Sequence, residues 1–222
     1  MAGTENSRGI HSRTLMLTQL GVLIAIMLVL HFTGIGFITL GPVRMTIMWV
    51  PAIVGAITLG PIAGAVLGGV FGVTVLMDMG PLTAILIDTD PVLTVIFMVV
   101  IRGLLVGFLS GMLFKGFGFI DKKRTWSFEA TGFLTALLNT TAFILGTVLI
   151  FGNHPGVHGW LEALWGLEIL PVEFAAEGAT RGSVFPALIA LVGTQAFIEM
   201  AICTLLSATI ARVLRTHLNK VS

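Results

Sequence analysis

The chain is poor in charged residues. Only 10% of its 222 residues are charged, and tyrosine is absent. A soluble domain has about 25% charged residues, so the composition excludes an ordinary water-soluble protein. The net charge of +1, with no basic tract, also argues against a nucleic-acid-binding protein.

Neither the cysteine nor the histidines predict a metal site. The single cysteine, Cys203, excludes a disulfide framework and a thiolate metal cluster. The five histidines, at positions 11, 31, 154, 158 and 217, are scattered and lack HExxH spacing, so we expect no metal site. Ser110 has no histidine at a matching depth, which argues against an intramembrane serine protease. We therefore expect no enzyme and no cofactor, and any coupling to ATP must come from a partner protein.

What the chain has in abundance is apolar sequence. It is 56% hydrophobic, with a mean hydropathy of +1.03, which predicts an all-α integral membrane protein in the lipid bilayer. We expect a single membrane domain over residues 1–222.

Gly60 and Pro61 divide one long apolar run, because proline ends one helix and begins the next. The six predicted helices are about 14–32, 47–59, 61–78, 91–114, 128–151 and 185–212. The first has no cleavage site after it and is expected to be retained.

The basic residues predict an orientation. With the N-terminus inside, cytoplasmic segments carry nine of the twelve lysines and arginines, whereas the outer loops carry Arg44 and Arg181. Both termini are therefore expected in the cytoplasm. The outer connections, 33–46, 79–90 and 152–184, are then the long ones. Long loops of this kind are usually functional or disordered.

Tryptophans and acidic residues mark the ends of the predicted helices. Residues 158–170 (HGWLEALWGLEIL) indicate a short interfacial helix, either a substrate lid or a passive anchor. Trp49 and Trp126 lie at helix ends, as is typical of the aromatic belt of membrane proteins. The acidic side chains around the second outer loop are best interpreted as solvated loop charges: Asp78, Asp88 and Asp90.

Three polar residues are predicted at similar depth on three helices. Arg102, Asn139 and Glu199 each lie eleven to thirteen residues from the ends of their segments. Ionisable groups at such depth are costly in lipid and usually face an interior cavity. We expect Glu199 to stay ionised with Arg102 as its partner, with Gln195 one turn outward. Two interpretations remain open, a structural ion pair and the floor of a substrate pocket.

Small residues predict close helix packing. Gly64, Gly68 and Gly72 recur every four residues and favour internal helix contacts. Gly21 and Ala25 have the same spacing on the first helix, where internal packing and docking to another membrane protein are both open. Arg44, in GPVRM (41–45), either faces a ligand from outside or is a solvated loop charge.

Four segments together resemble a known family. VPAIVGAITLGPIAGAVLGGVFGV (50–73) resembles the second and third helices of the substrate-binding S-components of energy-coupling factor (ECF) vitamin transporters. The resemblance continues, in the same order, in residues 101–115, 131–151 and 192–202, and covers nearly the whole chain. Among these proteins the segments look most like the pantothenate-type members.

The resemblance implies a fold, partners and a mode of action. It implies six helices with a vitamin bound near the outer face of the cell membrane, below the three longer loops. The partners implied are a transmembrane coupling subunit and two cytoplasmic ATPases that hydrolyse ATP. Family members dock through an Ala-xxx-Ala surface on the first helix. Gly21 and Ala25 match it here, with glycine in place of the first alanine.

The resemblance also implies a substrate site. The arginine of the fourth helix and the asparagine of the fifth match Arg102 and Asn139. In the last helix Glu199 is retained, whereas Gln195 replaces an asparagine and a proline is lost. The predicted substrate-binding residues are Arg102, Asn139, Gln195, Glu199, Arg44 and Trp49. An arginine with amide groups suits pantothenate, an anion with an amide and hydroxyls.

Other readings of the function stay open. Pyridoxine, a neutral vitamin, is an alternative substrate. Thiamine fits less well, because tyrosine is absent and only Trp49, Trp160, Trp165 and Phe residues are available outside to surround its cationic ring. A self-sufficient secondary transporter that relays ions through Glu199 and Arg102 is the alternative of a different class. The absence of an internal repeat argues against it.

Overall fold

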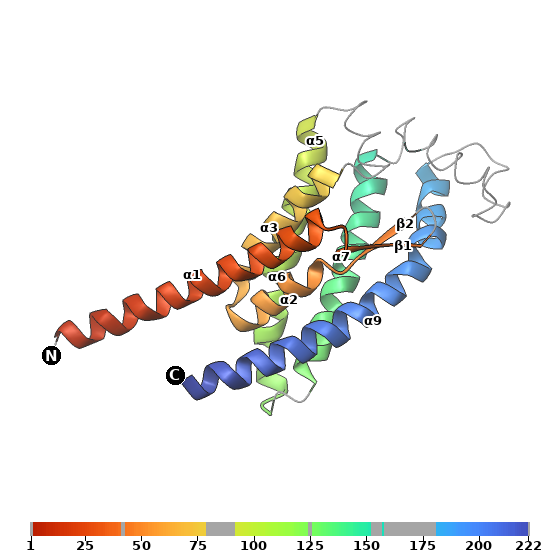
Figure 1. Cartoon of the computed structure of the whole chain (residues 1–222). Helices are drawn as coiled ribbons and strands as arrows, with labels where there is room; N and C mark the ends of the chain where they lie inside the picture. Colours follow the sequence, from red (N-terminus) through yellow and green to blue (C-terminus); the bar gives the residue numbers. More distant parts are fainter. Residues whose placement is uncertain are drawn as a thin grey trace.

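Helices make up almost all of the part of the chain that the structure describes. The computed structural model describes residues 2–40, 43–78, 92–123, 126–151, 157 and 181–221. Its helices are α1 (Ala2–Phe32), α2 (Trp49–Thr58), α3 (Pro61–Asp78), α5 (Val92–Ile96), α6 (Arg102–Ile120), α7 (Ser127–Phe151) and α9 (Arg181–Val221). A π-helical turn, η1 (Phe97–Ile101), joins α5 to α6 in one continuous rod (Figure 1).

Four of these helices are long and apolar enough to cross a membrane. They are Arg13–Phe32, Leu93–Ile120, Ser127–Phe151 and Ala196–Thr216. The two shorter apolar helices, Trp49–Thr58 and Pro61–Met77, fall below the length of a full span. The chain is thus a helical membrane protein, and six crossings with cytoplasmic termini stay a prediction.

The short helix α2 forms the centre of the molecule. Nine of its ten residues are buried, from Trp49 to Ile57. It packs against α3, α6, α7 and α9, and a helix that is apolar on every side is expected to be enclosed in this way. Gly60 ends the segment with φ of 102°, and Pro61 begins α3. The predicted division of the long apolar run at these two residues is correct.

The closest helix contact is between α3 and α6. A Cβ atom built on Gly64 would lie 2.3 Å from the carbonyl oxygen of Gly107, and one on Gly68 would lie 2.1 Å from that of Gly103. Only glycine permits backbones to approach so closely. The prediction of internal packing for the Gly64, Gly68 and Gly72 surface is therefore confirmed.

A two-stranded hairpin interrupts the helical fold between α1 and α2. Strands β1 (Phe37–Leu40) and β2 (Val43–Thr46) pair antiparallel, with Phe37 opposite Thr46. The expectation of an all-α protein missed it. The strands are rich in Phe, Ile, Val and Thr, which favour extended structure, and Gly41-Pro42 lies between them in the sequence.

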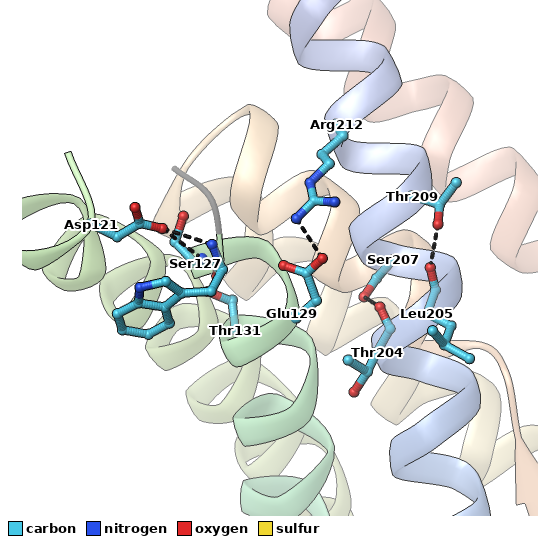
Figure 2. A network of polar contacts seen from close by, with 10 residues as sticks. Asp121, Ser127, Glu129, Thr131, Thr204, Leu205, Ser207, Thr209 and Arg212 are labelled. Carbon is cyan, nitrogen blue, oxygen red and sulfur yellow. Dashed lines mark hydrogen bonds and ion pairs between the residues drawn. The ribbon is translucent and has the colours of Figure 1, made fainter. Parts of the chain in front are cut away.

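Polar contacts join α6, α7 and α9 at the Asp121 end of the bundle (Figure 2). The Asp121 carboxylate accepts hydrogen bonds from the backbone N–H groups of Trp126 and Ser127, at 2.9 and 3.0 Å, and so caps the start of α7. Arg212 of α9 forms an ion pair with Glu129 of α7. These contacts hold α6, α7 and α9 together near the turn that follows Ile120.

Helix α1 is the least enclosed of the long helices. Figure 1 shows its N-terminal part leaving the bundle, and only 6% of its most apolar window is buried. Both α1 and α9 extend further than predicted, to Ala2 and to Val221. The predictions placed those boundaries at the limits of apolar sequence, whereas the helices continue into polar sequence.

Candidate substrate site

Arg102 begins α6, directly after the π-helical turn. Its guanidinium carbon lies 5.2 Å from the centre of the Phe143 ring on α7, a cation–π contact. Its Nε atom is buried and has no hydrogen-bond acceptor among the residues described. A buried donor without a partner is rare in native structures and is typical of a site that binds a ligand or water.

Glu199 of α9 faces the end of the hairpin. Its carboxylate lies beside the backbone of Thr46, and its Oε1 atom is buried with no partner in the described part of the chain. One turn further along α9, the Cys203 thiol donates to the carbonyl oxygen of Thr46 at 3.9 Å. Helix α9 therefore contacts the last residue of β2 through two side chains.

The predicted pairing of Arg102 with Glu199 is only partly right. The two groups attract each other, but no direct ion pair joins them among the described residues. Helix α7 lies between α6 and α9, and its extensive contacts with both keep the two charges apart. Phe143, also on α7, stacks against the Arg102 guanidinium. The protein contact of the Glu199 carboxylate is instead the Thr46 backbone.

Asn139 lies on the intervening helix α7. Its side chain is 8% exposed, and its Oδ1 atom has no hydrogen-bond partner within the described residues. Thr147, two turns along the same helix, is fully buried, and its hydroxyl has no partner among the residues that the structure describes. Sequence analysis missed Thr147, and the only available signal was a hydroxyl residue in an otherwise apolar run.

Trp49 has a different environment from the one expected. An interfacial tryptophan would be partly exposed, whereas Trp49 is completely buried and its ring lies 4.7 Å from that of Phe71. The aromatic-belt interpretation is therefore wrong for this residue, because α2 is enclosed by α1, α3, α6 and α9. Its indole Nε1 has no acceptor among the described residues. Trp126 is 45% exposed, as an interfacial residue should be.

Several residues of the predicted sites have side chains outside the described part of the chain. The side chains of Arg44, Gln195 and Asp78 lie outside the described residues, although their backbones belong to β2, α9 and α3. Asp88, Asp90 and the segment 158–170 also lie outside them.

The predicted docking pair on α1 is exposed. Gly21 and Ala25 both face outward, and a Cβ atom on Gly21 would meet nothing within 4 Å. Internal packing, one of the two interpretations left open, is thus not seen in the described part of the chain.

The chemistry that this arrangement offers is recognition. A guanidinium, an amide and a carboxylate come from three packed helices, and one polar atom of each has no partner in the described part of the chain. Among the described residues, no group of three or more His, Cys, Asp or Glu side chains could hold a metal ion.

Comparison with known proteins agrees with this picture. The model of the family "ECF transporter, substrate-specific component" matches residues 15–211, from the first apolar helix to the last. No curated protein matches the chain. Because the match covers most of the sequence, this chain belongs to the family of substrate-specific components of ECF transporters.

Proposed function

We propose that this chain captures pantothenate for an ATP-driven ECF importer in the cell membrane. Membership of the family supports a transport component that binds substrate and is not itself an enzyme. The observation that carries the substrate proposal is the set of unpartnered buried polar atoms on Arg102, Asn139 and Glu199. Burial without a partner is costly, so these groups favour a ligand that supplies the missing hydrogen bonds.

The proposed ligand complements these groups. The pantothenate carboxylate would bind Arg102, because charge-assisted hydrogen bonds to a guanidinium are strong in a dry site. Its hydroxyl and amide donors would bind Glu199 and Asn139, each of which has a buried acceptor oxygen without a partner among the described residues. Gln195, Arg44 and Trp49 complete the proposed site, and Trp49 offers an indole N–H.

Delivery would depend on partner proteins. We expect a transmembrane coupling subunit and two cytoplasmic ATPases, with both termini of this chain in the cytoplasm. The exposed small residues Gly21 and Ala25 are the proposed docking surface, since small side chains let helices approach closely in lipid. The partner ATPases, rather than this chain, would hydrolyse ATP.

Calorimetric titration of the purified protein in detergent tests the substrate. We expect tight binding of pantothenate and no binding of pyridoxine or thiamine. Binding of pyridoxine alone would keep the function and replace the substrate. If none of the three binds, and the chain alone in liposomes carries out uptake driven by a pH gradient, the capture function is wrong and the chain is a secondary transporter.

A further inference from the structure

A groove on the outside of the bundle reaches Arg102. It has a volume of about 290 Å³ and lies between α7 and the continuous rod of α5, η1 and α6. Its lining includes Phe97, Leu105, Leu109, Leu138, Gly146 and Ile150. Arg102 is the one charged residue in this lining, and every other lining residue is apolar.

The rim of the groove faces away from the protein core. Phe97 is 62% exposed, Leu105 is 56% exposed and Leu109 is 43% exposed. All three belong to a helix that is long and apolar enough to cross the membrane. Apolar side chains exposed on such a helix contact lipid, so the groove opens towards the hydrocarbon of the bilayer.

Backbone geometry creates this opening. The π-helical turn η1 supplies Phe97, Met98 and Ile101 to one wall, and such turns are common at functional sites. On the other wall Gly146 leaves room for Met98, whose Cε atom lies 3.3 Å from where a Cβ would stand. A larger residue at position 146 would therefore narrow the groove.

The charge in the groove is only partly compensated. The guanidinium of Arg102 stacks on Phe143 and is attracted by Glu199, but no direct ion pair reaches it among the described residues. A cation in an apolar, lipid-facing groove favours an anion whose remaining surface is apolar.

The depth of Arg102 fits such a ligand. The apolar helix that carries Arg102 runs from Leu93 to Ile120. Arg102 lies nine residues from Leu93, roughly 14 Å at 1.5 Å per residue, and eighteen residues from Ile120, roughly 27 Å. Arg102 is therefore nearer to the Leu93 end of this helix, and snorkelling of its long side chain can bring the charge nearer still. Leu105, Leu109 and Leu138 continue the groove inward, in the direction that an acyl chain takes.

We propose that this groove binds a single-chain alkyl carboxylate from the bilayer, with the carboxylate on Arg102 and the alkyl chain along Leu105, Leu109 and Leu138. The volume is too small for a two-chain lipid, being near the lower limit of small-ligand pockets. The proposal goes beyond vitamin capture: the alkyl carboxylate would occupy the same Arg102 guanidinium as the pantothenate carboxylate, so the two would compete for it.

Photolabelling of the protein in phosphatidylcholine nanodiscs, without vitamin, tests the proposal. The probe is palmitate with a diazirine in the middle of its chain, and the labelled peptides are mapped by mass spectrometry. We expect label concentrated on residues 97–109 and 138–150 and displaced by excess palmitate. The matching long-chain alcohol probe should label the exposed faces of all helices evenly.

Two variants separate the groove from the fold. Leu109→Trp fills the groove while leaving Arg102 in place, and it should reduce labelling of the groove at least fivefold. Leu205→Trp changes an equally lipid-facing residue of α9 and should leave this labelling unchanged. Even labelling by the acid probe, equal labelling by the alcohol, or no effect of Leu109→Trp would each overturn the proposal. None of these results depends on whether pantothenate binds.

Discussion

Single buried polar atoms are the main indication of function in this protein. The apolar helices bury a guanidinium, an amide and a carboxylate, and each keeps one atom without a protein partner in the described part of the chain. By contrast, Ser110 and Thr135 hydrogen-bond to each other at 2.8 Å across α6 and α7. A satisfied pair of this kind stabilises helix packing, whereas an unsatisfied group is retained at a cost and needs another explanation.

Replacing Arg102 with alanine tests the proposed carboxylate contact. Loss of a charge-assisted hydrogen bond in a buried site costs about 1.5–3 kcal/mol, so pantothenate affinity should fall more than about tenfold. Arg212→Ala is the control, because Arg212 pairs with Glu129 at the far end of α7. Calorimetry measures the affinities of both variants. A drop in thermal stability with unchanged affinity would mean that Arg102 has a structural role.

Asn139 and Thr135 offer a matched comparison, one turn apart on α7. Asn139→Ala should weaken vitamin binding roughly five- to tenfold, which corresponds to one lost hydrogen bond of about 1 kcal/mol. Its melting temperature should change little, because Oδ1 has no partner among the described residues. Thr135→Ala removes the bond to Ser110 and should lower the melting temperature without lowering affinity. The reverse pattern would assign Asn139 to packing.

Helices α3 and α6 pack so closely that they form one structural unit. Their backbones touch at Gly64, Gly68, Gly103 and Gly107, in a pattern in which each glycine faces the carbonyl oxygen of another. Arg102 precedes Gly103 directly, so this contact fixes the height and rotation of Arg102. The position of the candidate site therefore depends on residues that never contact a ligand.

Gly68→Ala should force α3 and α6 apart. The new methyl group would stand 2.1 Å from the carbonyl oxygen of Gly103, and overpacking of this kind costs about 1–3 kcal/mol. Gly116→Ala on α6 is the matched control, because its Cβ meets nothing within 4 Å and alanine favours a helix. Thermal unfolding in detergent should show a lower melting temperature for Gly68→Ala and an equal or higher one for Gly116→Ala. Equal melting temperatures for both variants would show that the contact is not tight.

The molecule encloses some of its apolar helices and leaves others exposed. Helix α2 is enclosed, whereas the apolar α1 leaves the bundle with Gly21 and Ala25 exposed (Figure 1). An exposed small-residue pair contributes nothing visible to internal packing. In a component of a larger transporter, this surface fits contact with another subunit.

The double variant Gly21→Leu and Ala25→Leu tests docking of the complete protein. Vitamin binding by the isolated variant should be unchanged, because neither position packs against the described part of the bundle. Uptake into liposomes that also contain the partner subunits and ATP should be abolished. Gly116→Leu, a bulky change at another open glycine, should retain uptake. Loss of vitamin binding together with uptake would indicate that α1 packs internally.

Sequence alone determined the membrane environment, the main helices and the identity of the polar residues. Apolar length, the Gly60-Pro61 break and the glycine spacing are local properties, and each acts through a short range of the chain. The hairpin, the π-helical turn and the burial of Trp49 were decided by tertiary structure, because each depends on which surfaces meet. The partner of Glu199 shows the same limit. Depth along a helix placed Glu199 level with Arg102, but α7 packs between α6 and α9 and sets Phe143 against the arginine, while the contact between α9 and β2 sets the Thr46 backbone beside the carboxylate.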